Sequence, residues 1–590
     1  MLKRCLLINL CLLFAWIVGS VELGLANPAK DTATEATPVA SSGSSTFQTS
    51  QPRIEQPNAF YLPLDDRPCN YLFPGQIARI GGGLLRTPDR VYLGSAFTPG
   101  HPAKLKDWLR SCPGNSTMII SADMLAYGGL LASRTSATSL EQALDNLQVL
   151  EELSQAGHSL RVLVTQPRLS LCTSTAAAPY EAALRNWACR NEKNPPANVP
   201  DSIFQEYQAV RMRNFQVTEH LLQLAKSGVI DRLIIGQDDS AAKGIHIEEL
   251  NKLHEEVNEL GLEGKVSILC GADELGACLA AGWLAEVNNY YPNIELIYSD
   301  PTYEAKVPPM EYYTLGETAR RHLDICQAKA SQGTGTVIFV ETPADKPFEP
   351  PSAEGTPETK TAAQELLKRI DLKFSQEGRL RPYGLADLHL VNRAEPILAQ
   401  TIIDNLPMWQ LACYSAWNTP SNSLGTAIAQ ACAQQIALVR GHHWSPYRRL
   451  ESEKTQQAFT MARLVDDYAY QALIRQTLTG QYKNIDIRAN PLLNQAGPAS
   501  VEVRAMAIPW AQRLWQEKLQ GKTFDSAITG EKLMFADMYL EIVLPWPRLF
   551  EIEERLNLTL QVQKEPTEKA SYLKSENTRP TEPKTTNSKR

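Results

Sequence analysis

The sequence lacks the short motifs that identify several common enzyme classes. It has no Gly-x-Ser-x-Gly elbow, so a serine hydrolase triad is not supported. The glycine run at 81–83 neither follows an expected strand nor has GxGxxG spacing, which argues against a dinucleotide site. Histidine is scarce, with 9 residues, and the one adjacent pair, His442-His443, would point apart on a helix rather than share a metal.

Cysteine is present without a metal-binding pattern. Of 11 cysteines, Cys5 and Cys11 lie in the N-terminal apolar stretch, and the remaining nine include no CxxC pair and no zinc-type spacing. We therefore expect no metal and no cofactor. Cys172 and Cys189 lie in one polar connection, and the sequence leaves open whether they form a disulfide in an oxidising compartment.

A concentrated basic surface is also absent. The net charge is -7 and both signs are spread evenly along the chain, so we expect no nucleic-acid partner. No stretch after the N-terminus holds about 18 unbroken apolar residues. We therefore expect no stable membrane insertion once the N-terminal segment is removed.

Residues 1–26 have the features of a cleaved secretory signal. Lys3 and Arg4 precede an apolar run at 5–19, and small residues at 24–26 suit a signal peptidase. This pattern predicts a secreted or periplasmic protein. An uncleaved amphipathic anchor is the alternative.

Composition divides the mature chain into further parts. Residues 27–58 and 563–590 are polar and too poor in large apolar residues to fold, so we expect a disordered linker and a disordered tail. Between them we expect four segments: an α/β main domain at 59–345, a Pro-rich break at 346–360, a second α/β lobe at 361–440 and a helical C-terminal region at 441–562. We expect little chemistry in the last of these.

Short apolar runs alternate with amphipathic helices, which is typical of parallel strands joined by helical crossovers. The expected strands are 60–64, 91–93, 117–121, 161–165, 232–235, 266–269, 294–298, 337–340, 388–391 and 411–414. Eight of them precede the break, so we expect a (β/α)8 barrel-like main domain plus a smaller lobe. Two doubly wound α/β domains, divided near residue 305, are the alternative.

Carboxylates follow six of these strands, at the end of the sheet where ligands bind in either fold. They are Asp65, Asp66, Asp123, Asp238, Asp239, Asp273, Glu274, Asp300 and Glu341. Carboxylates held close together cannot all stay ionised cheaply, so one takes a raised pKa and serves as an acid. The alternative for each residue is a structural role, such as capping the next helix or closing an ion pair.

Asp238-Asp239 is the sharpest of these cases. Adjacent residues leaving a strand point in different directions, so one faces a pocket while the other supports it. The pair resembles the Asp-Asp pair of hexosaminidase-type glycoside hydrolases, which implies Asp239 as acid/base and Asp238 as its partner or as the substrate orienter. The resemblance covers only the dipeptide, and here the pair follows the fifth expected strand, unlike in that family.

The remaining site residues are expected to bind substrate. Asp65, Asp66, Asn70, Asp123, Tyr127, Asp273 and Glu274 would line the pocket, and Arg67, Arg134, Arg168 and Lys243 would bind polar groups. Trp417, Asn418 and Asn422 would close it from the second lobe, with the ring stacking on a sugar and the amides contacting hydroxyls. Alternatively, Trp417 fills the core and the asparagines cap turns.

Five separated segments together resemble a bacterial family of unknown function, DUF4127. They are YLPLDDRPCN, ADMLAYGGLLASR, GQDDSAAKG, GADELG and YSAWNTPSNSLGTAIA. The resemblance runs from about residue 58 to about residue 555. It implies that these segments form a common site, and it carries no established activity.

These observations predict an extracytoplasmic hydrolase that acts on a glycosidic bond of a sugar or cell-envelope glycan. Two alternatives stay open. One is a non-catalytic protein that binds a small polar ligand with the same residues. The other is a metal-dependent hydrolase, because clustered carboxylates suit Mg²⁺ or Ca²⁺.

Overall fold

The computed structural model describes residues 56–563 except 97, 172, 350–354, 379 and 483–492. Several predictions lie outside these residues: the signal sequence, nearly all of the linker and tail, part of the Pro-rich break, and any pairing of Cys172 with Cys189. Within the described ranges, every helix is too short or too polar to cross a membrane.

The first sheet has six parallel strands in the order β2-β1-β3-β4-β5-β6. They are β1 Asn58–Leu62, β2 Leu84–Arg86, β3 Thr117–Ser121, β4 Ser159–Gln166, β5 Arg232–Gln237 and β6 Val266–Cys270. β1, β3, β4, β5 and β6 each contribute residues to two different cores. Ala59 and Tyr61 face one core, whereas Phe60 and Leu62 face the other. Burial on both faces explains why the strands read as apolar runs.

The second sheet has five parallel strands in the order β11-β10-β9-β7-β8. They are β7 Asn293–Tyr298, β8 Lys329–Ala330, β9 Thr336–Glu341, β10 Tyr383–Asp387 and β11 Leu411–Ser415. In both sheets the first strand lies between the second and the third, and later strands add on the side of the third. The two sheets therefore repeat one doubly wound strand order.

The expected α/β class is confirmed, and the strands form two sheets. The seventh and eighth expected strands, β7 and β9, lie in the second sheet with β10 and β11, and no closure of the first sheet is detected among the described residues. The predicted strand at 91–93 is wrong: Arg90–Leu93 is a 3-10 helix that Asp89 caps, and Val91 is exposed. The strand predicted at 388–391 lies earlier in the chain, because β10 ends at Asp387. The Asp387 carboxylate accepts the backbone N–H groups of His389 and Glu395.

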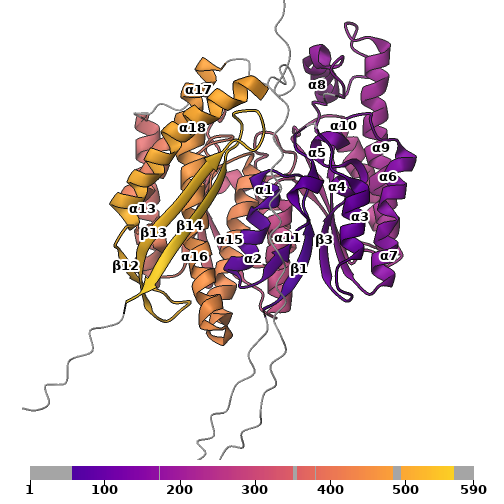
Figure 1. Ribbon diagram of the computed structural model, residues 1–590. Coiled ribbons are helices and arrows are strands. Elements are labelled where there is room, and N and C mark those ends of the chain that lie inside the picture. The colour runs from indigo at the N-terminus through magenta and orange to yellow at the C-terminus, as the bar shows by residue number, and fades with distance from the viewer. Residues whose placement is uncertain are drawn as a thin grey trace, which may run out of the picture. The chain divides into compact units, whose positions relative to one another are not determined.

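Both sheets share one layer of helices (Figure 1), formed by α2 (Phe73–Ile80), α11 (Leu275–Val287) and α15 (Pro420–Arg440). Their apolar side chains form a single core with Tyr61 of the first sheet and Val340 of the second. α11 packs tightly against its neighbours: a Cβ added at Gly282 would lie 2.2 Å from the carbonyl oxygen of Ile325.

The outer faces of the sheets have their own helices. The first sheet is covered by α3 (Pro102–Arg110), α4 (Ala122–Tyr127), α6 (Leu140–Leu147), α7 (Val149–Gln155), α9 (Asp201–Lys226) and α10 (Ile245–Glu259). The second is covered by α13 (Pro357–Glu377), α14 (Pro396–Asn405) and α16 (Pro446–Arg463). Ser139 and Gln142 form a capping box at the start of α6.

In the C-terminal region, α16 has Ser445 as its N-cap and continues without a break into a π-helical stretch at Leu464–Ile474 and then α17 (Arg475–Gln481). After α18 (Leu493–Leu514) comes an antiparallel sheet of β12 Thr523–Asp525, β13 Lys532–Val543 and β14 Glu553–Val562. The β13–β14 hairpin lies against α16 and α18 (Figure 1). The turn between its strands reaches the carboxyl ends of the first sheet, because Trp546 donates to Asp66.

Candidate functional site

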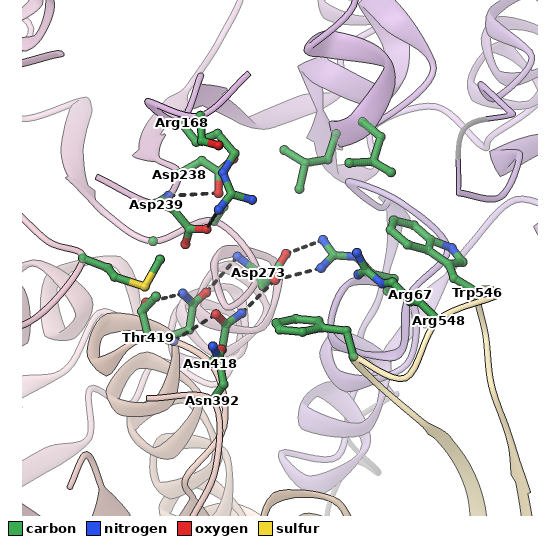
Figure 2. A pocket seen from close by; sticks show the side chains of 18 of the residues that line it. Arg67, Arg168, Asp238, Asp239, Asp273, Asn392, Asn418, Thr419, Trp546 and Arg548 are labelled. Atoms are coloured by element: carbon green, nitrogen blue, oxygen red, sulfur yellow. Dashed lines mark hydrogen bonds and ion pairs between the residues drawn. The ribbon is translucent and has the colours of Figure 1, made fainter. Parts of the chain in front are cut away.

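A cavity of about 580 Å³ lies at the carboxyl ends of the strands of the first sheet. Its wall contains charged side chains that follow β1, β3, β4, β5 and β6, namely Arg67, Arg134, Arg168, Asp238, Asp239 and Asp273. Loops that follow β10 and β11 of the second sheet add Asn392, Asn418 and Thr419 (Figure 2). The first turn of α15 adds Asn422. The structure thus brings together residues that are far apart in the sequence, at the edge where doubly wound sheets bind ligands.

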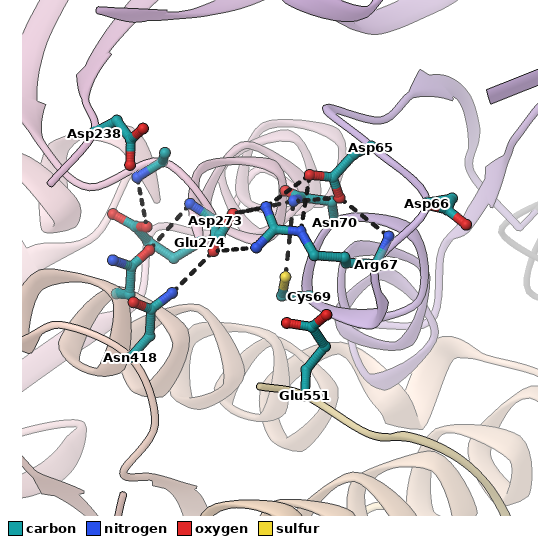
Figure 3. Close-up of polar contacts among 12 residues, drawn as sticks. Asp65, Asp66, Arg67, Cys69, Asn70, Asp238, Asp273, Glu274, Asn418 and Glu551 are labelled. Carbon is teal, nitrogen blue, oxygen red and sulfur yellow. Dashed lines mark hydrogen bonds and ion pairs between the residues drawn. The ribbon is translucent and has the colours of Figure 1, made fainter. Parts of the chain in front are cut away.

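Arg67 joins two carboxylates at the base of this wall (Figure 3). Its Nη2 lies 2.6 Å from Asp65 Oδ2 and 2.6 Å from Asp273 Oδ1, and its Nη1 lies 3.0 Å from Asp273 Oδ2. Asn70 Nδ2 donates to both carboxylates, at 3.0 and 3.1 Å. Burial disfavours the guanidinium charge, but Asp273 and Asp65 outweigh it, so the pKa of Arg67 lies well above its usual value. Arg67 therefore fixes Asp273 on the cavity wall, with Asp65 as a supporting partner.

Asp238 and Asp239 each have their own arginine. Arg134 forms an ion pair with Asp238, and Arg168 forms one with Asp239. The backbone N–H of Asp239 also donates to Asp238 Oδ1 at 2.9 Å. The two side chains are therefore held in different directions, as expected for adjacent residues that leave a strand.

The two carboxyl groups differ in acidity. Burial alone would raise the pKa of Asp238, but Arg134 and Arg168 outweigh it, and the pKa lies below its usual value. Burial raises the pKa of Asp239 against the opposing effect of Arg168, and the charge on Asp238 adds to the increase. One member is thus a stabilised anion, and its neighbour holds a proton more readily.

Amides from the loop after β11 connect the second sheet to the same wall. Asn418 Nδ2 donates to Asp273 Oδ2 at 2.9 Å, and the backbone N–H of Asp273 donates to Asn422 Oδ1 at 3.0 Å. Asn418 has φ +79°, a conformation that asparagine tolerates better than most residues. Asp273 consequently receives donors from both sheets.

Several predicted residues lie behind the wall rather than on it. Asp65 and Asn70 belong to the Arg67 network described above. Asp66 accepts a hydrogen bond of 2.7 Å from Trp546 Nε1. Asp123 is fully buried and accepts the backbone N–H of Thr165 at 2.9 Å, and burial raises its pKa to about 7. Tyr127 lies under the guanidinium of Arg213, 4.5 Å from ring centre to Cζ.

Three more predicted residues are outside the cavity. Glu274 Oε1 lies 2.8 Å from His322 Nε2 in a fully buried pair. Trp417 is 6% exposed, and its ring packs against Phe550 at 5.6 Å instead of facing the cavity. This placement matches the alternative in which Trp417 fills the core. Lys243 is exposed and is not part of the wall.

The acids expected after the seventh and eighth strands belong to the second sheet. Asp300 is the N-cap of a 3-10 helix and accepts the backbone N–H of Thr302 at 2.9 Å. Glu341 forms an ion pair with Arg369. Neither lines the cavity, and the strands that carry them belong to the second sheet.

One part of the wall was not predicted. Arg475, Trp546, Arg548 and Phe550 come from the C-terminal region, in which we expected little chemistry. The run from Trp546 to Phe550 combines aromatic and basic residues shortly after β13. That combination was a usable signal in the sequence, but it does not follow a parallel strand.

A metal site would need three or more His, Cys, Asp or Glu side chains close together. No such group is found in the described part of the chain. The carboxylates of the cavity point instead to arginine and amide donors.

Comparison with known protein families gives a match. The model of a family described as "Protein of unknown function (DUF4127)" matches residues 59–554, a span that contains every wall residue named above. No curated protein matches the chain.

Proposed function

This chain belongs to the DUF4127 family, and from that premise we propose that it is an exported hydrolase of the glycosidic bond of a sugar or cell-envelope glycan. Asp239 is the acid/base group, and Asp238 is the anion beside it. The arginines and asparagines of the wall bind the hydroxyl-rich parts of the substrate.

The observation that carries this proposal is the divergence of two adjacent carboxyl groups in one cavity. Asp239 has a raised pKa and Asp238 a lowered one. Pairs of carboxyl groups whose environments push their pKa values apart are typical of acid/base catalysis near neutral pH. Asp239 would donate its proton to the leaving-group oxygen, and the bond to Arg168 would hold its carboxyl group in position.

A second candidate is a binding protein without catalysis. It is favoured by the ion pairs themselves: both carboxylates already have an arginine partner. Such a site is charge-balanced before a ligand arrives, and hydroxyl groups could bind between the paired ions without any proton transfer.

The test is turnover of chromogenic glycosides, both neutral and N-acetylated, by the purified protein. We expect Asp239→Asn to lower the rate by about 100-fold or more, since acid/base groups contribute on that scale. Asp300→Asn, a strand-end acid of the second sheet, is the matched control and should keep the wild-type rate. Thermal unfolding of both variants checks that they fold.

Equal turnover by wild type and Asp239→Asn would reject the proposed role of Asp239. Binding of the same sugars measured by calorimetry, with no product from any of them, would favour the binding protein instead.

A further inference from the structure

The C-terminal side of the cavity wall differs from the rest in its charge pairing. Five arginines line the cavity: Arg67, Arg134, Arg168, Arg475 and Arg548. Four of them have a carboxylate partner, and that of Arg548 is Glu551, at 2.8 and 2.6 Å. Arg475 has no such partner among the described residues.

Arg475 is held in place without being neutralised. Its Nη1 donates to Gln471 Oε1 at 2.9 Å, and its guanidinium lies 4.8 Å from the centre of the Phe550 ring. Burial lowers its pKa and the charge of Arg548 adds to the decrease, and together they outweigh the opposing effects of Tyr470, Glu551 and Asp466. Arg393 also repels Arg475, since the charge of Arg475 lowers the pKa of Arg393. This corner therefore carries excess positive charge facing the cavity.

The neighbouring side chains make this corner rigid. The guanidinium of Arg548 lies 4.5 Å from the Trp546 ring and 5.0 Å from the Phe550 ring, and Glu551 binds it at two oxygens. Arg67 lies over Trp546 as well, at 5.1 Å. Because guanidinium groups cover these rings, the aromatic residues position arginines here more than they offer a face to a sugar.

We infer that the cavity takes a ligand with an anionic group, a carboxylate or a phosphate, and that this group binds at Arg475. The inference rests on the proposed function, because it assigns the substrate class of the same cavity. The anion would gain the charge partner that Arg475 lacks. Arg67, Arg134 and Arg168 are already paired with carboxylates, so the anion would bind at Arg475, and the ligand would bind in one orientation, with its neutral part at the acid/base pair.

The test is calorimetric binding of three probes to the purified protein: D-glucuronate, inorganic phosphate and neutral D-glucose. We expect an anion to bind more tightly than glucose, and Arg475→Gln to weaken that anion by about tenfold or more. Arg475→Lys should restore part of the affinity. Arg320→Gln removes an exposed arginine outside the cavity and should change nothing. Comparing the affinities for glucuronate and for phosphate shows which of the two anionic groups the cavity prefers.

Wild-type protein that binds neither anion, or that binds both as tightly after Arg475→Gln, would overturn the inference. Asp239→Asn distinguishes this failure from failure of the proposed function. If catalysis is wrong but the anion site is right, the wild-type protein gives no product, or Asp239→Asn turns over as fast as wild type, while Arg475→Gln still loses the anion. If catalysis is right but the anion site is wrong, Asp239→Asn loses turnover while Arg475→Gln binds the anion as tightly as wild type.

Discussion

Acids follow the carboxyl ends of the strands in both parallel sheets, and the two sheets share one strand order. The acids of the two sheets differ in the groups that they contact. In the second sheet, Asp387 is fully buried and accepts backbone N–H groups of His389 and Glu395 at 3.0 and 2.8 Å. Glu341 has one arginine, and Asp300 caps a turn. Each of these acids therefore serves its own loop.

In the first sheet the acids share partners across different loops. Arg67 joins Asp65 to Asp273, and Asn418 of the second sheet also reaches Asp273. In this molecule the strand-end acids that line the cavity are those with an arginine partner from another loop. The position of an acid after a strand predicts that it lies at the carboxyl edge of the sheet. Whether the acid also faces the cavity depends on its ion-pair partner.

The largest expected effect is on the Arg67 network. Arg67→Met should lower the free energy of unfolding by about 3 to 5 kcal/mol, because it leaves Asp65 and Asp273 buried without their cation. Arg369→Met in the second sheet leaves only Glu341, so its loss should be smaller. Urea denaturation measures both. Equal losses would remove the distinction drawn between the two sheets.

The contact between the sheets should come next. Asn418→Ala loses the hydrogen bond to the Asp273 carboxylate and places alanine at φ +79°, so we expect a loss of about 2 to 3 kcal/mol. Asn418→Gly loses the same bond but adopts this φ freely, so it should cost less. Denaturation curves of the two variants test this order, and a glycine variant as unstable as the alanine one would contradict the backbone argument.

The pH dependence of stability should differ in sign between the sheets. The pKa of Asp123 is raised to about 7, so the folded state binds this proton more tightly than the unfolded state, and the free energy of unfolding falls as the pH rises from about 4 to about 7. The free energy of unfolding of the wild type should therefore decrease between about pH 5 and about pH 8. Asp123→Asn should make this decrease smaller by on the order of 2 kcal/mol.

Asp300 is the matched case in the second sheet. Hydrogen bonds from Thr302 lower its pKa, so its contribution is present above about pH 4 and is lost as the pH falls. Asp300→Asn should leave the slope between about pH 5 and about pH 8 unchanged. Stability curves that respond identically to the two substitutions would refute the assignment.

The smallest effect is expected where the C-terminal turn meets the first sheet. Trp546→Phe loses the bond of 2.7 Å to Asp66 and should cost about 1 kcal/mol. Trp409→Phe is the control, because the indole N–H of Trp409 has no partner in the described ranges and its ring packs near Phe524. Thermal unfolding compares the two, and a larger effect at Trp409 would argue against the anchoring role of Trp546.

Local features were predictable because they depend on neighbouring residues. The buried strands read as apolar runs, and Ser139 and Ser445 marked helix starts. The division into two sheets was not predictable from strand count, because strand pairing is decided by contacts between distant segments.

The site was predicted in part for the same reason. The strand-end rule placed Asp238, Asp239 and Asp273 correctly at one edge, but it could not tell that Asp123 turns toward Thr165. It also missed Arg475 and Trp546, which reach the cavity from a helix and a hairpin turn.

The helices shared by the two sheets limit how a ligand can enter. α11 packs against α15, and their side chains belong to a core that extends into both sheets. A clamshell opening would expose this apolar interface to water at about 25 cal/mol for each Å². Such a hinge is therefore unfavourable, so a ligand of the proposed kind would have to enter and leave without separating the two sheets.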